Sequence, residues 1–205
     1  MFPVPSEGIT IPEPSEFDRP GERWTLRELL TEYGRVTNTH LMLSEDTIAT
    51  LMNQRVPIDR GLVIAPEDVH SVVEKLCAHS GYAFTLDRAS EPRLIGVKSL
   101  YTAARTNLRQ HALWVPTEEL DQWKDHSAFL ISTVLHFEHT DARTLTNSMR
   151  AMLTDANTQQ IIPVGNSNTS ILVGFAPHVH GLVQALQTVD EYGARAAESA
   201  EATDS

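Results

Sequence analysis

Nine histidines and one cysteine are the side chains of this 205-residue sequence that suggest metal binding or catalysis. His136 and His139 are three residues apart, and His178 and His180 are two apart. Zinc would need three or four such ligands, so the two pairs would have to converge. Residues i and i+2 diverge by about 200° on a helix such as the one that Pro177 opens. We therefore expect surface histidines and no metal site.

The sequence gives no support for nucleophilic catalysis or for phosphate binding either. Cys77 falls on the apolar stripe of a predicted helix, as a small buried side chain would, and His79 faces elsewhere on that helix. The carboxylate pairs Glu67–Asp68 and Glu118–Glu119 lie at predicted helix starts, where negative charge suits the helix dipole. The turn at 165–168 lacks the lysine and the following helix of a phosphate loop. The sequence therefore predicts a protein that is not an enzyme and binds no cofactor.

The composition predicts a folded chain whose partners are proteins. Apolar residues make up 41% and charged residues 21% of the sequence, as in ordinary globular domains. The net charge is −11 and the basic residues are scattered, which argues against a nucleic-acid partner. No segment has the roughly 18 consecutive apolar residues of a membrane-spanning helix, and no signal peptide is visible at the N-terminus.

The spacing of apolar residues predicts an α+β protein of two small modules, with helices packed on small mixed sheets. We expect a first module over 24–100, a connector over 101–126 and a second module over 127–193. Residues 1–23 contain five prolines and predict an extended arm without a core of its own. Residues 194–205 are small, polar and acidic, which predicts a disordered tail.

Local signals mark the helices of the first module. Thr25 and Glu28 form a capping-box pattern at the start of one helix. Pro66 suits the first position of another helix, and Gly81 suits its exit. The segment 55–58 is expected to be an edge strand, because its proline would interrupt a central one.

The second module is expected to follow the order β-α-β-β-α. A β-rich run ends at Phe137, a helix follows Asp141, two strands flank the turn at 165–168, and Pro177 opens a last helix. The same order occurs in KH-type RNA-binding modules. A KH module needs a G-x-x-G loop with basic flanks, which this sequence lacks, so an RNA-binding KH-like module is the outside alternative.

Both modules resemble the N-domains of bacterial secretins. In the second module the matching stretches are VLHFEHTDARTL (134–145), IIPVGNSNTSILVGF (161–175) and PHVHGLVQALQTVDE (177–191). They correspond to the strand and helix start, the hairpin, and the final helix with its valine–aspartate ending in that family. The first module is similar to the preceding secretin N-domain, itself similar to the short N-terminal domain of TonB-dependent receptors. Its matches are TLRELLTEYGRVTNTHLML (25–43) and VIAPEDVHSVVEKLCAHSGYAFTLD (63–87).

The resemblance implies a structural role in a bacterial envelope assembly, such as a secretion or pilus system. The β-rich region that forms the secretin barrel does not follow the second module. The resemblance therefore implies a periplasmic or envelope-associated subunit, a homo-oligomer that also docks to other components. A monomeric signalling or receptor-docking domain is the alternative.

Four aromatic side chains in polar surroundings are the candidate interface residues. They are Phe2, Phe17, Trp114 and Trp123, whose rings have no obvious core to join. For the two tryptophans, a second interpretation is that they pin the connector onto a module.

Overall fold

The chain divides into two compact units, each described here by itself. The computed structural model describes residues 2–13, 24–102, 108–149 and 153–203. Unit 1 comprises Met1–Thr106 and Asp125–Phe129, and unit 2 comprises Asn107–Lys124 and Leu130–Ser205.

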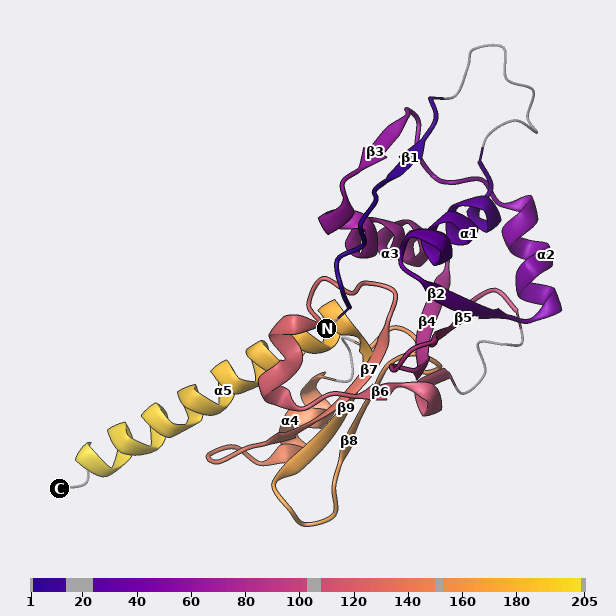
Figure 1. Ribbon diagram of the computed structural model, residues 1–205. Coiled ribbons are helices and arrows are strands. Elements are labelled where there is room, and N and C mark those ends of the chain that lie inside the picture. The colour runs from indigo at the N-terminus through magenta and orange to yellow at the C-terminus, as the bar shows by residue number, and fades with distance from the viewer. Residues whose placement is uncertain (1, 14–23, 103–107, 150–152, 204–205) are drawn as a thin grey trace. The chain divides into compact units, whose positions relative to one another are not determined.

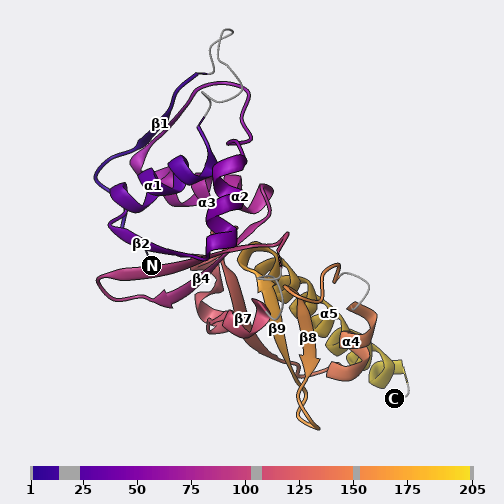
Figure 2. The same ribbon diagram turned by 90° about the vertical axis from the view of Figure 1, so that its right-hand side faces the viewer.

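Unit 1 packs three α-helices against a three-stranded mixed sheet (Figures 1 and 2). Its helices are α1 (Leu26–Val36), α2 (Glu45–Asn53) and α3 (Val69–His79), the last preceded by the 3-10 turn η1 (Pro66–Asp68). The sheet has the order β2 (Thr39–Leu43), β5 (Arg93–Ser99) and β4 (Tyr82–Arg88). Strand β5 is parallel to β2 and antiparallel to β4. Because β5 is central, β2 is an edge strand of this sheet.

The local signals predicted for unit 1 are confirmed. The Thr25 hydroxyl accepts the Glu28 amide at 3.2 Å, and the Glu28 carboxylate accepts the Thr25 amide at 2.7 Å, which completes the capping box. Pro66 opens the turn before α3. Gly81 leaves that helix with a φ of +80°, and the Tyr101 ring occupies the space that a Cβ would need. Glycine is required here by both the backbone angle and the close contact.

The N-terminal arm differs from the prediction, because it packs into unit 1. Strand β1 (Ile9–Ile11) pairs antiparallel with β3 (Leu62–Ile64). Ile9 and Ile11 are buried on either side of an exposed Thr10. The strand expected at 55–58 is reduced to an isolated antiparallel bridge between Thr25 and Arg55, and the regular strand of this region is β3.

Residues Asp125–Phe129, called the junction segment below, belong to unit 1. The sequence pattern predicts 125–126 as part of the connector and 127–129 as part of the second module. The Phe84 amide of β4 donates to the Ala128 carbonyl at 2.7 Å, and Phe84 and Phe129 form a parallel bridge. Phe129 is fully buried, and its ring meets that of Phe84 edge-on at 5.6 Å. The junction segment thus extends the sheet of unit 1 beside β4.

Unit 2 contains the predicted β-α-β-β-α order, and an additional strand precedes it. The elements in chain order are η3 (Leu108–His111), β6 (Leu113–Trp114), η4 (Thr117–Gln122), β7 (Leu130–His136), α4 (Ala142–Met149), β8 (Gln160–Pro163), β9 (Thr169–Phe175) and α5 (Ala176–Thr203). The sheet order is β6-β7-β9-β8, with β6 parallel to β7 and the other pairs antiparallel.

Helices α4 and α5 cover one face of this sheet (Figure 1). Ile131 and Leu172 of the sheet are fully buried against Val179 of α5 and its neighbours. Helix α5 continues to Thr203, so residues 194–203 of the tail predicted as disordered are helical. Among the described residues, no helix has both the length and the apolar character needed to cross a membrane.

Candidate interaction surfaces

The face of the unit 2 sheet opposite the helices carries exposed apolar side chains. Side chains alternate between the two faces of a strand, so burial of Ile161 and Leu135 in the core leaves Ile162 and Val134 on the other face. Val134 is 42% exposed and Ile162 is 37% exposed. Both lie opposite Ile171 of β9, which aligns the three side chains across β7, β9 and β8.

Trp114 extends this row onto β6. It is 62% exposed and lies opposite Ser132, two residues before Val134 on β7, which makes Val134 its diagonal neighbour. Trp114, Val134, Ile171 and Ile162 are called the open-face row below. Sequence reasoning found Trp114 but missed the others, whose β-branched residues in alternating strands are also typical of a core.

The other predicted interface residues lie elsewhere. Trp123 is partly buried against the core of unit 2, so its ring pins the segment after η4 to that unit. Phe17 lies outside the described residues. Phe2 packs within unit 1, where its ring centroid is 5.2 Å from those of His70 and Phe129. Within the described residues, Phe2 and Trp123 thus each pack inside their own unit, and only Trp114 among the predicted interface residues is largely exposed.

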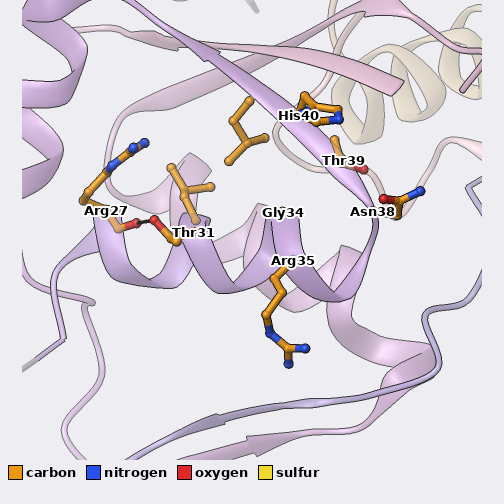
Figure 3. A pocket seen from close by; sticks show the side chains of 9 residues that line it. Arg27, Thr31, Gly34, Arg35, Asn38, Thr39 and His40 are labelled. Carbon is orange, nitrogen blue, oxygen red and sulfur yellow. Dashed lines mark hydrogen bonds between the residues drawn. The ribbon is translucent and has the colours of Figure 1, made fainter. Parts of the chain in front are cut away.

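A groove of about 510 Å³ runs between α1 and β2 in unit 1 (Figure 3). Gly34 faces β2, and a Cβ there would approach the Thr39 carbonyl oxygen at 2.9 Å. Arg27 and Thr31 line the groove from α1, and His40 lines it from β2. The groove thus lies along an edge strand, with main-chain groups and a few polar side chains as its possible contacts.

A polar cluster anchors the loop between β7 and α4. The Asp190 carboxylate of α5 accepts the backbone amides of Glu138, His139 and Thr140 at 2.8, 3.0 and 2.7 Å. Burial raises the pKa of this carboxyl, but the amide bonds outweigh that effect and hold the pKa below its ordinary value. Asn168 donates to the carbonyls of the same loop. Both residues lie in the stretches that carry the resemblance to secretin N-domains. In this protein those residues hold the loop between β7 and α4 in place.

The histidines weighed for metal binding have separate contacts. His180 Nε2 lies 2.8 Å from Asp121, and His136 Nδ1 lies 3.2 Å from the Thr169 hydroxyl. In the part of the chain that the structure describes, no three histidine, cysteine or acidic side chains are grouped to hold a metal ion. Cys77 is fully buried, and burial raises the pKa of its thiol, which disfavours a thiolate nucleophile.

No protein-family model and no curated protein matches this chain. A solved structure from Klebsiella pneumoniae, the type II secretion system outer membrane complex of PulD, PulS and the PulC HR domain, matches with a TM-score of 0.56 at 12% identity. That match covers 81% of this chain and 25% of the other, so this chain spans a quarter of the length of the protein it matches.

Two further structures match at lower TM-scores. The GspC–GspD complex of the enterotoxigenic Escherichia coli type II secretion system has a TM-score of 0.28 at 12% identity, with 90% of this chain and 99% of the other covered. The Salmonella SPI-1 injectisome structure with InvG N0N1 has 0.33 at 13% identity, with 94% and 99% covered. The fold predicted from the sequence resemblance is confirmed by the first match: this protein has the fold of secretin N-terminal domains.

Proposed function

We propose that this protein is a non-enzymatic subunit of a bacterial envelope assembly, and that copies of it bind one another through the open face of the unit 2 sheet. Other proteins of the assembly would bind elsewhere, which makes the chain both a self-associating subunit and an adaptor.

The observation that carries this proposal is the open-face row. Exposed apolar side chains that adjoin on one rigid sheet are typical of protein interaction sites, whereas single exposed ones are not. Trp114 is among them, and tryptophan is enriched at the energetic centres of interfaces. A second copy of the chain could supply the partner surface. Its helix α5 carries two large side chains, Val189 and Tyr192, that are 42% and 61% exposed and could pack against the open-face row.

The fold match supports the envelope setting. The matched Klebsiella structure is an outer membrane complex of several proteins. A subunit with this fold would serve such a complex by binding proteins, for which no catalytic group is needed. The groove beside β2 supports the adaptor role, because an edge strand can add a strand from another protein.

Replacing both Val134 and Ile162 by lysine is expected to convert an oligomer into a monomer. Two buried positive charges would oppose the contact, while the folded unit would tolerate them because both side chains reach solvent. We expect light scattering of the full-length protein to show a concentration-dependent oligomer that the double variant loses, with unchanged thermal unfolding.

The matched control is Val63→Lys, at an apolar position of unit 1 that is 78% exposed. This variant should assemble like the wild type. A wild-type protein that is monomeric at every concentration would refute self-association and favour the monomeric docking domain. An oligomer that survives in the double variant would place the contact on another surface.

A further inference from the structure

His70 on α3 joins the N-terminal arm to the core of unit 1. Its Nε2 lies 3.1 Å from the Pro3 carbonyl oxygen, and its Nδ1 lies 3.0 Å from the Tyr33 hydroxyl on α1. A carbonyl oxygen only accepts, so Nε2 carries the proton and Nδ1 accepts from Tyr33. The neutral ring therefore satisfies both partners at once.

His126 joins the junction segment to the same helix. Its Nδ1 lies 2.8 Å from the Glu74 carboxylate, whose side chain has no exposed surface. Burial raises the pKa of Glu74, and the hydrogen bond from His126 opposes that shift. This contact ties the junction segment to α3.

The Phe2 ring links these two contacts. Its centroid lies 5.2 Å from the His70 ring and 5.1 Å from the His126 ring, and the Arg93 guanidinium of β5 lies 5.1 Å from it. Phe2, His70, Glu74 and His126 are called the latch below. The arm and the junction segment are thus held by side chains that touch one another.

Further protons would weaken the latch. A proton on His70 Nδ1 would end its role as the acceptor from the Tyr33 hydroxyl and place a positive charge in a cluster that already holds the Arg93 guanidinium. Burial lowers the pKa of His70, and the positive charges of His126 and Arg93 lower it further against the pull of the Pro3 carbonyl. Glu74 is the carboxylate facing this cluster from α3, and Glu91 meets Arg93 at 3.8 Å. Acidification would therefore place a charged His70 ring beside the Arg93 guanidinium inside this buried cluster.

We propose that the latch is operated by protons: it holds the arm and the junction segment on unit 1 near neutral pH and releases both as the pH falls towards about 5. Release would uncover the side of β3 that β1 now pairs with. It would also free the segment that directly precedes β7 in the chain.

The direction of this pH dependence follows from how tightly the folded and the unfolded chain bind the proton of His70. The folded state binds His70's proton more weakly than the unfolded state, so the stabilisation is complete above the ordinary pKa of 6.5. It is lost as the pH falls below that value through the folded pKa. The same holds for local release of the arm, because the released His70 is hydrated.

Amide hydrogen exchange of the full-length protein at pH 7.5 and 5.5, corrected for intrinsic exchange rates, tests this proposal. We expect protection of residues 2–11 and 125–129 to fall about tenfold or more at the lower pH. Protection of strand β9 in unit 2 should not change. Equal protection of the arm at both pH values in the wild type would overturn the proposal.

The variant His70→Gln with His126→Asn separates proton binding from packing. Each amide can replace the ring N–H that donates to Pro3 or to Glu74, but neither titrates, so the pH dependence should disappear. His79→Gln, an exposed histidine of the same helix, should behave as the wild type. A double variant that keeps the wild-type pH dependence would contradict the latch. If the double variant does not hold the arm at either pH, the single variant His70→Gln is measured instead. Loss of its pH dependence would support the latch, and wild-type pH dependence would contradict it.

Discussion

Replacing Phe129 by alanine is expected to lower the free energy of unfolding of unit 1 by about 3–5 kcal/mol, the usual cost of removing a buried phenylalanine. The Phe129 ring has no exposed surface. Its centroid lies 5.6 Å from that of the Phe84 ring and 5.2 Å from that of the Phe2 ring. Its loss would leave a cavity beside β4 that the backbone bridge between Phe84 and Phe129 prevents from collapsing.

The measurement is native-state hydrogen exchange of the full-length chain in increasing urea, followed separately in β4–β5 of unit 1 and β8–β9 of unit 2. We expect unit 1 to lose stability in Phe129→Ala and unit 2 to keep it. This would hold even though residue 129 comes after the first elements of unit 2 in the chain. Trp114→Ala is the control, because that ring is 62% exposed and its removal should leave unit 1 unchanged. An unchanged unit 1 in Phe129→Ala would mean that the junction segment is not part of its fold.

The elements predicted best are those whose cause is local. The capping box joins Thr25 to Glu28 across three residues, so the sequence pattern contains both partners. The same is true of the exit at Gly81 and of the turn that Pro66 opens. Apolar periodicity likewise predicted the β-α-β-β-α order of unit 2, because each of its elements buries one continuous face.

The elements that were missed depend on partners far away in the chain. Ile9 and Ile11 alternate as in a strand, but the prolines around them favour an arm, and their partner β3 begins at Leu62. Phe129 adjoins the β-rich run of β7, so no local signal separates it from unit 2. Its partner Phe84 belongs to a strand of unit 1. Pairing over such distances is decided by tertiary packing.

The candidate interface shows the same limit. An aromatic ring in a polar stretch draws attention to Trp114, but Val134 and Ile162 alternate with core residues as they would in any strand. Their exposure becomes visible only when α4 and α5 are seen to cover one face of the sheet. The latch residues were missed because His70, Glu74 and His126 lie apart in the sequence and no motif joins them.

Replacing Asp190 by alanine is expected to lower the free energy of unfolding of unit 2 by about 2–4 kcal/mol. Amides that lose an acceptor cost about 1–3 kcal/mol each, and these partly buried amides can regain part of that from water. Asp190 is 8% exposed, and its carboxylate accepts three consecutive backbone amides, from Glu138 to Thr140. It fixes the start of the loop that leads into α4. Gly193, one turn further along α5, lets the helix approach this loop, because a Cβ there would meet the Thr140 hydroxyl at 2.7 Å.

Urea denaturation of the full-length chain, followed by hydrogen exchange in β8 and β9, measures this loss. Asp190→Asn keeps the oxygen that accepts from His139 and Thr140 but loses the charge, so its effect should be intermediate. Glu191→Ala removes an exposed carboxylate of the next residue and should have little effect. Because the folded pKa of Asp190 lies below its ordinary 3.8, its contribution is complete above that value and is lost as the pH falls through the folded pKa. The difference in the free energy of unfolding between wild type and Asp190→Ala should therefore shrink in strong acid. Equal stability of Asp190→Ala and Glu191→Ala at neutral pH would instead show that the other contacts of the loop hold it.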